Sequence, residues 1–196
     1  MQFNTRCLSL LWMAAFAVTG IPGIAADSIG YFDTITSDPL PIVGHQYFTR
    51  HCFMYDRNVA VTTNYWRGTL VPINTPVTLV SLEGKKMVLR LANGIAVTIK
   101  NVEKYSRRDM VKISHDMLAL QPVPIERFDE ATVNSIKSGT LKNGMTKEQA
   151  VMARGYPPGD QTPSIDADVW LYWSNRRTVQ TIVFSNGVLV QGSGSY

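Results

Sequence analysis

The chain has 196 residues, 45% of them hydrophobic, with 19 basic and 15 acidic side chains and a formal net charge of +4. A positive charge this small does not indicate a nucleic-acid partner, and none is expected. The 2 cysteines are too few for the disulfide framework of a small secreted domain, so a hydrophobic core has to stabilise the fold.

Residues 1–26 have the three-part pattern of a secretory signal peptide. Arg6 gives the basic tip, residues 7–18 form an apolar run with one serine, and small residues ending at Ala26 form the exit. The apolar run has 12 residues, fewer than the roughly 18 that a membrane-spanning helix requires. We therefore expect cleavage after Ala26, or one residue earlier, and a mature protein in the periplasm.

Cleavage there would leave 18 basic and 15 acidic residues, because Arg6 is the only charged residue removed. Cys7 lies within the apolar run and not at its exit, where a lipoprotein carries its lipidated cysteine. Any association with the outer membrane is therefore expected to be only indirect. Cys52 is left without an intramolecular disulfide partner.

Proline-containing segments divide the mature chain. Residues 27–44 combine two prolines with small polar residues and no sustained period, which indicates an extended lead-in. Pro122 and Pro124 mark a joint further along. About 170 mature residues suit one ordinary domain or two small ones, and the prolines favour two. We predict one domain over residues 45–122 and another over residues 123–196.

Short antiparallel strands are predicted in the first domain, because apolar and polar residues alternate between turn residues. Residues 59–65 form the first, with the larger odd-numbered side chains expected to face a core. The strands that follow are predicted over residues 77–82, 86–91 and 95–99. Asn93-Gly94 predicts a type I′ turn between the last two strands. The odd-numbered apolar residues of each, Met87, Leu89, Leu91, Ile95, Val97 and Ile99, should share one face per strand.

Four or five such strands cannot bury both faces of a flat sheet, so we expect them to curl into a small barrel. The stretch from Arg67 to Val77, with its Gly, Pro and Val positions, resembles the entry into a bacterial Src-homology-3-like barrel. Residues 106–118 are predicted as an amphipathic helix packed on this barrel, with Ser106 and Asp109 as its capping pair. Its apolar stripe is Met110, Ile113 and Met117.

The second domain begins with two short helices. The first is indicated by apolar residues up to Ile136, and the second is predicted from Thr146 to about Arg154. Thr146 and Gln149 have the spacing of a capping box, and Gly155 ends the helix. A three-stranded meander is predicted next, over residues 169–173, 179–185 and 188–190. Helices followed by antiparallel strands predict a two-layer α+β sandwich.

The order of these features resembles that of the BamE-like domain, the small-protein-A family of outer-membrane-protein assembly lipoproteins. The matching elements cover residues 129–191, about a third of the chain. The residues that match are Ile136, Gly144-Met145-Thr146, Gln149, Val151, Gly155, Pro157, Trp170, Tyr172, Val183-Phe184 and Gly187-Val188. The resemblance implies two helices on one face of a three-stranded sheet, and a role in envelope assembly. The chain departs from the family in lacking the lipidated cysteine and in carrying an added N-terminal barrel.

No catalytic residue, metal site or cofactor is predicted. His45, His51 and His115 lack the spacing of a helical metal pair, and no phosphate-binding glycine loop precedes a helix. His51 and Cys52 could suggest a thiol nucleophile, but neighbours on a strand point to opposite faces. We therefore expect a buried free thiol at Cys52, with a reactive thiol as the alternative.

Aromatic residues beside arginines are the candidate partner-binding sites. Trp170 and Tyr172 share one face of their strand and are expected to be the core pair. Trp173 then faces outward or toward the barrel, with Arg176 and Arg177 beyond it. Exposed tryptophan beside arginine is typical of interface anchors, and packing of Trp173 against the first domain is the alternative.

A second candidate is Tyr65-Trp66-Arg67, at the end of a predicted barrel strand. Ligand-binding barrels of this type use the neighbouring loop, and burial of the tryptophan under the following helix is the alternative.

The leading hypothesis is a non-enzymatic envelope protein that binds another envelope protein during outer-membrane assembly or maintenance. Peptidoglycan binding through Tyr65 and Trp66, or inhibition of a hydrolase through Trp173, are the alternatives.

Overall fold

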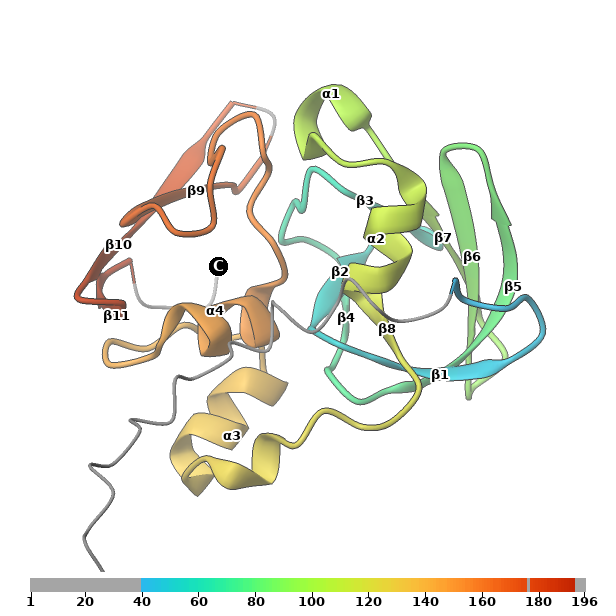
Figure 1. Cartoon of the computed structure of the whole chain (residues 1–196), viewed down its shortest axis with the longest axis horizontal. Helices are drawn as coiled ribbons and strands as arrows, with labels where there is room; N and C mark the ends of the chain where they lie inside the picture. Colours follow the sequence, from blue (N-terminus) through green and yellow to red (C-terminus); the bar gives the residue numbers. More distant parts are fainter. Residues whose placement is uncertain (1–39, 176, 193–196) are drawn as a thin grey trace, which may run out of the picture.

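The computed structural model describes residues 40–175 and 177–192; the predicted signal peptide and residues 27–39 of the lead-in lie outside this part. The fold is mixed α+β, with four α-helices in this part (Figure 1). The strands are β1 (Gln46–Thr49), β2 (Phe53–Tyr55), β3 (Val59–Val61), β4 (Thr69–Val71), β5 (Pro76–Glu83), β6 (Lys86–Leu91), β7 (Ala96–Lys100), β8 (Leu118–Ala119), β9 (Val169–Trp173), β10 (Val179–Ser185) and β11 (Val188–Gln191). The helices are α1 (Glu103–Ser106), α2 (Met110–Met117), α3 (Glu130–Lys137) and α4 (Lys147–Arg154), and Ile125–Arg127 form a short 3₁₀ turn, η2.

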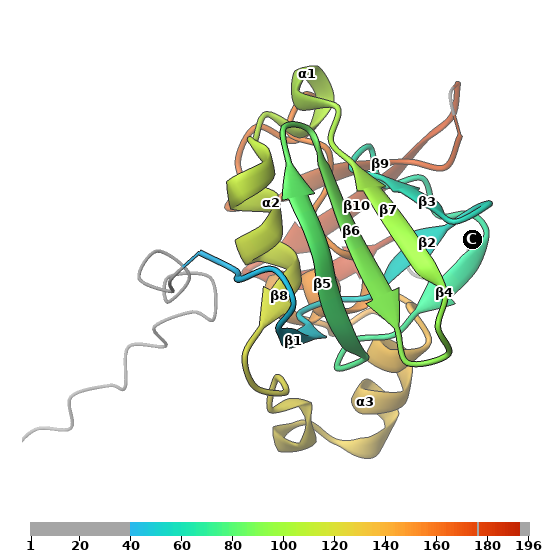
Figure 2. The same ribbon diagram turned by 90° about the vertical axis from the view of Figure 1, so that its right-hand side faces the viewer.

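A six-stranded sheet in the order β3-β7-β6-β5-β1-β8 forms the first lobe and curls into a half-barrel (Figure 2). Its pairs are antiparallel except β3 with β7, which is parallel. Strands β2 and β4 pair separately. The predictions of strands over 77–82 and 86–91 are confirmed as β5 and β6, and that over 95–99 as β7, displaced by one residue. A curled sheet is therefore present, as the alternation predicted.

The buried faces predicted for β6 and β7 are confirmed within the strands. Met87, Leu89, Val97 and Ile99 are at most 1% exposed in the sheet core, whereas Ile95 precedes β7 and is half-buried. The strand predicted over residues 59–65 is confirmed only at Val59–Val61, and its predicted face is wrong because the even-numbered Ala60 faces the core. The register is reversed by the tight hairpin before β3, which fixes where the strand begins.

The turn between β6 and β7 also differs from the prediction. Gly94 has φ +85°, but Asn93 does not have a positive φ. The Gly94 N–H donates to the Leu91 carbonyl at 2.9 Å, and the Leu91 N–H donates to the Ile95 carbonyl at 2.9 Å. The connection is thus a longer loop with glycine at its left-handed position. At Asn186-Gly187, between β10 and β11, both central residues are left-handed, with φ of +51° and +75°.

The helix predicted over 106–118 is confirmed as α2 only from Met110 to Met117, and Ser106 is the last residue of a separate helix, α1. Arg107 adopts φ +57° and ends α1, so α2 begins only after Asp109. The Asp109 carboxylate accepts the Lys112 N–H at 2.7 Å and caps α2. Ser106 is not a cap, and its hydroxyl donates to the Asn101 side-chain oxygen at 2.7 Å. The apolar stripe is confirmed, since Met110, Ile113 and Met117 are all buried against the sheet.

The second lobe follows the predicted order of elements. Helix α4 starts with the expected capping box: Thr146 Oγ1 accepts the Gln149 N–H at 3.2 Å, and Gln149 Oε1 accepts the Thr146 N–H at 2.9 Å. The sheet is β11-β10-β9, with β10 central. Trp170 and Tyr172 are 0% and 1% exposed, which confirms them as the core pair.

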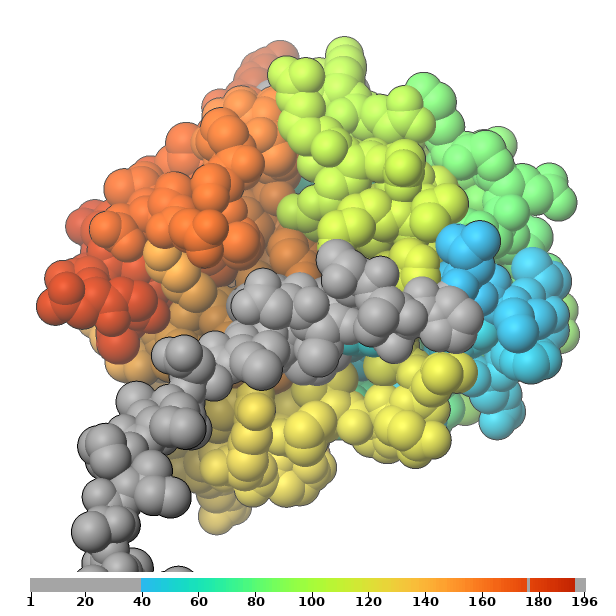
Figure 3. Space-filling model, in the orientation of Figure 1, coloured from blue at the N-terminus to red at the C-terminus, as the bar shows by residue number. Residues whose placement is uncertain are grey.

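The structure contains two hydrophobic cores. The sheet core is formed by residues between Tyr47 and Leu118. The C-terminal core is formed by residues 123–189 together with Cys52, Trp66 and Ile73, which come from before the proline joint. In Figure 3 the orange segment that follows α4 lies directly against the yellow-green residues of α1 and α2. The two lobes therefore share side chains at their contact.

The helices are short. Within residues 40–175 and 177–192, none has both the length and the apolar character needed to cross a lipid bilayer.

Candidate functional site

A groove of about 480 Å³ runs between the two lobes and combines parts of both predicted partner-binding sites. Its lining comes from the β2–β3 hairpin, the segment after β3 and the loop after β9. The lining residues are Met54, Asp56, Val59, Val61, Tyr65, Arg67, Ser174, Asn175 and Arg177. Clefts of 300–1,000 Å³ are the usual size of ligand sites. Tyr65 and Arg67 are thus brought to one groove with Arg177, which lies far from them in the sequence.

The β2–β3 hairpin forms one wall of the groove. Arg57 and Asn58 have φ of +49° and +60°, and Asp56 and Val59 exchange backbone hydrogen bonds of 2.9 and 3.0 Å. Left-handed conformations are unfavourable for arginine, and such backbone strain clusters at binding sites. Gly68 has φ +107°, and a Cβ there would overlap the Tyr55 carbonyl. This close approach places Arg67 beside the hairpin.

The charges at the groove are mostly positive. Arg67 Nη2 lies 2.8 Å from Asp56 Oδ2, and Arg57 Nε lies 3.8 Å from Asp56 Oδ1. Arg177 is exposed, and no acidic side chain of the described ranges pairs with it. Among the residues that line the groove, Arg67 and Arg177 are basic and Asp56 is acidic, so the groove favours an acidic ligand.

The floor of the groove is apolar. Met54, Val59, Val61 and Tyr65 are all half-buried and line it. An apolar floor with a cationic rim matches the composition of protein–protein interfaces, in which aromatic residues, Met and Arg are enriched. The arrangement fits an extended chain segment that carries acidic side chains.

Trp66 does not line the groove. It is 6% exposed and belongs to the C-terminal core, where the Arg154 guanidinium carbon lies 4.3 Å from its ring centre. Gly139 has φ +70°, and a Cβ there would overlap the Trp66 ring. The prediction that Trp66 is a surface anchor is therefore wrong. Tyr65 lines the groove, whereas Trp66 packs in the C-terminal core.

The second predicted aromatic site, Trp173 with Arg176 and Arg177, lies only partly within the described residues. Trp173 is half-buried at the end of β9, directly before the groove residues Ser174 and Asn175. Arg177 lines the groove itself, and Arg176 lies outside the described residues. The loop after β9 therefore contributes an arginine and polar groups to the groove.

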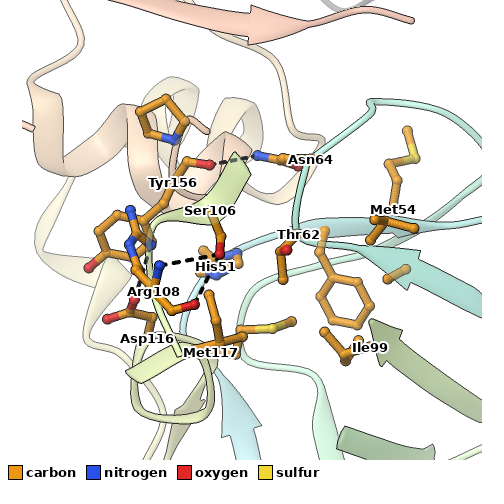
Figure 4. Close-up of a pocket in the computed structure, with 15 residues that line it drawn as sticks. His51, Met54, Thr62, Asn64, Ile99, Ser106, Arg108, Asp116, Met117 and Tyr156 are labelled. Carbon is orange, nitrogen blue, oxygen red and sulfur yellow. Dashed lines mark hydrogen bonds and ion pairs between the residues drawn. The ribbon is translucent and has the colours of Figure 1, made fainter. Parts of the chain in front are cut away.

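A smaller cavity of about 60 Å³, which we call the interlobe cavity, lies next to the groove and shares Met54 and Val61 with it. Figure 4 shows His51, Ser106 and Arg108 on one side of this cavity and Met54 and Ile99 on the other. The remaining lining residues are Phe53, Ala60, Thr62, Asn64, Ile113, Asp116, Met117, Tyr156 and Pro157. Sequence reasoning missed this cavity, because its walls come from four separate segments.

Charges at the interlobe cavity are internally paired. Asp116 is 2% exposed, and its carboxylate oxygens lie 3.0 Å from Arg108 Nη1 and 2.7 Å from Lys112 Nζ. The Arg108 guanidinium carbon lies 4.2 Å from the centre of the Tyr156 ring, and this cation–π contact joins the two lobes across the cavity. The Asn64 amide donates to the Tyr156 carbonyl at 3.1 Å and holds the same loop.

His51 and Cys52 lie in different surroundings: His51 lines the interlobe cavity and Cys52 belongs to the C-terminal core. His51 lines the interlobe cavity, where burial lowers its pKa, and its Nδ1 lies 2.8 Å from the Cys52 carbonyl. Because that oxygen only accepts, Nδ1 carries the proton of the neutral ring.

Burial raises the pKa of the Cys52 thiol to about 12. The thiol donates to the Ile136 carbonyl at 3.1 Å and accepts the Ile73 N–H at 3.2 Å. The expectation of a buried thiol is confirmed.

Within the part of the chain that the structure describes, no group of three His, Cys, Asp or Glu side chains is placed to hold a metal ion. Comparison with known proteins gives no match to a family model, a curated protein or a solved structure.

Proposed function

We propose that this protein is an exported, non-enzymatic interaction module of the bacterial envelope, and that the groove binds an extended segment of another envelope protein. The supporting sequence features are the signal pattern of residues 1–26 and the resemblance of residues 129–191 to BamE-like domains. In its finer form, the proposal treats residues 45–122 as an Src-homology-3-like barrel and residues 123–196 as a BamE-like domain.

The groove is the observation that carries this proposal. Its apolar floor and its two lining arginines, Arg67 and Arg177, suit a segment with acidic side chains, and both lobes contribute to it. A partner that lies in the groove would contact Tyr65, Arg67 and Arg177 together. The partner is therefore expected to recognise the joined lobes and not either one alone.

Photo-crosslinking in intact cells tests the proposal. A photoreactive phenylalanine analogue is introduced at Tyr65 or Arg177, which line the groove, and at Lys142, which is exposed and does not line it. We expect the same envelope protein to be captured from both groove positions and not from Lys142. Capture at the Lys142 level from all three positions would contradict the proposal.

Charge reversal tests the chemistry of the partner. The double variant Arg67→Glu/Arg177→Glu is expected to abolish the crosslink from Tyr65, because acidic side chains would then face like charges. Lys137→Glu, an exposed position at the end of α3, is the matched control. Undiminished capture by the double variant would rule out an acidic segment.

Peptidoglycan remains the second candidate, because Tyr65 is half-buried in an open groove where it could stack on a sugar ring. Burial of Trp66 removes the other aromatic residue on which this alternative depended. Sedimentation with purified peptidoglycan separates the two candidates. Retention that is lost in Tyr65→Ala would favour the cell wall over a protein partner.

A further inference from the structure

The interlobe cavity and the groove are separated by two side chains. Met54 and Val61 line both, and both are half-buried. Met54 belongs to β2 and Val61 to β3, so the same hairpin that forms a wall of the groove also forms a wall of the cavity. A chain segment in the groove therefore lies within reach of the cavity.

The size of the cavity limits what it can hold. Its volume is about 60 Å³. A cavity of roughly 10–15 Å³ holds one water, so this cavity has room for about four to six non-hydrogen atoms. That is the size of one branched aliphatic side chain.

The lining favours an uncharged, apolar group. Phe53, Ala60, Ile99, Ile113 and Met117 supply carbon surface from β2, from the curled sheet and from α2. The polar groups at the opposite side already have partners within the protein, as in the ion pairs of Asp116 and the hydrogen bonds of Ser106 and Asn64. A charged group placed there would lose its hydration without gaining a new partner.

We propose that the interlobe cavity receives one leucine-sized aliphatic side chain from the acidic segment that binds in the groove. This inference depends on the proposed function and adds the anchor residue of the partner. The acidic side chains of the segment face Arg67 and Arg177, and the aliphatic side chain passes Met54 and Val61 into the cavity. Few residues carry most of the binding energy of an interface, and such anchors fill pockets of this kind.

Methionine-methyl NMR of the mature chain tests the anchor. The probes are the capped peptides acetyl-Glu-Leu-Glu-amide, acetyl-Glu-Ala-Glu-amide and acetyl-Lys-Leu-Lys-amide. Met117 lines only the cavity, Met54 lines cavity and groove, and Met145 and Met152 in the C-terminal core are internal controls.

The leucine peptide with glutamates is expected to shift the Met54 and Met117 signals and to leave the controls unchanged. The alanine peptide lacks three carbons and is expected to bind at least about tenfold more weakly. The lysine peptide is expected to bind more weakly than the leucine peptide with glutamates, because its positive charges would face Arg67 and Arg177. A shift of Met54 without Met117, or equal binding of the leucine and alanine peptides, would overturn the inference.

A cavity-filling variant provides a second test. Ala60→Val places two more carbons against the cavity and is expected to remove the preference for leucine over alanine. Ala119→Val, at a buried alanine outside the cavity lining, is the matched control. Ile113→Val enlarges the cavity, so it is expected to raise the affinity for acetyl-Glu-Phe-Glu-amide relative to the leucine peptide. An unchanged ratio in both cavity variants would contradict the inference.

The two proposals can fail separately. If Tyr65 captures an envelope protein in cells while Met117 never responds to the leucine peptide, the anchor is wrong and the proposed function stands. If Met117 responds but Tyr65 and Arg177 capture nothing beyond the Lys142 background, the anchor site is real and the envelope partner is wrong.

Discussion

The two hydrophobic cores of this protein are assembled differently. The sheet core comes from one continuous stretch, residues 47–118, and consists mainly of aliphatic side chains from adjacent strands and α2. The C-terminal core also uses Cys52, Trp66 and Ile73 from the first lobe, and it encloses a charged residue, Arg154, that is 1% exposed. The second core is therefore complete only when the first lobe is in place.

Arg154 shows why the shared core matters. Its guanidinium carbon lies 4.3 Å from the centre of the Trp66 ring and 5.9 Å from that of Tyr172, and Nη2 donates to Gln180 Oε1 at 3.1 Å. A buried guanidinium needs such contacts to offset its lost hydration. The contacts come from both lobes, so separation of the lobes would leave the charge poorly compensated. The same junction forms the groove and the cavity.

The largest expected effect is that of Trp66→Ala, which should reduce the free energy of unfolding by about 3–5 kcal/mol. The change leaves a void beside Gly139 and removes the ring that faces Arg154. Hydrogen exchange should accelerate first in β9 and β10. Leu89→Ala in the sheet core is the comparison, and it should accelerate exchange first in β6 and β7. Equal acceleration in both lobes for Trp66→Ala would mean that the cores respond as one.

Cys52→Ala is expected to lower the free energy of unfolding by about 1–3 kcal/mol, because it leaves the buried Ile73 N–H without its acceptor. Urea titration measures the change, with Cys52→Ser as the variant that retains an acceptor.

With its pKa raised to about 12, the native Cys52 thiol should also react with a thiol reagent at pH 8 roughly a thousandfold more slowly than in the unfolded chain. Rapid native labelling would contradict its buried position.

Acidification should weaken the contact between the lobes through His51. Its folded pKa is lowered, mainly by burial, so below about 6.5 the unfolded chain binds the proton more readily than the folded one. The backbone bond to Cys52 and the charge of Asp116 oppose this shift, while Arg108 and Arg50 add to it. Stability is then retained above pH 6.5 and falls as the pH decreases, by at most about 1.4 kcal/mol per pH unit for one proton. Thermal unfolding from pH 7.5 to 5 should show a shallower decline in His51→Asn.

The smallest expected effect is that of Thr146→Ala, about 1 kcal/mol, because the capping box at the start of α4 loses one of its two bonds. Thr146→Ser retains the hydroxyl and should differ little from the natural protein. The loss should appear in the exchange of α4 and the C-terminal sheet and not in β6 or β7. An effect of Thr146→Ala on the sheet core would mean that the two cores unfold together.

Several elements were predictable because their determinants lie within a few residues. The capping box at Thr146, the alternation in β6 and β7 and the core pair of β9 were all derived from neighbouring residues and are confirmed. The start of α2 at Met110 was missed because the left-handed Arg107, which separates it from α1, is not marked by a glycine. The register of β3 was missed because a hairpin without glycine, at Arg57-Asn58, precedes it. Both errors concern non-glycine residues with positive φ, which sequence patterns do not reveal.

By itself, the sequence determined the strands β5 to β7 and their buried faces, helix α4 and the core pair of β9, because capping and alternation act over short distances. Tertiary structure alone decided that Tyr65 and Arg177 share a groove, that Trp66 belongs to the other lobe's core, and that a cavity lies beside Met54. These features depend on contacts between residues tens of positions apart, and such contacts form only when the two lobes pack against each other.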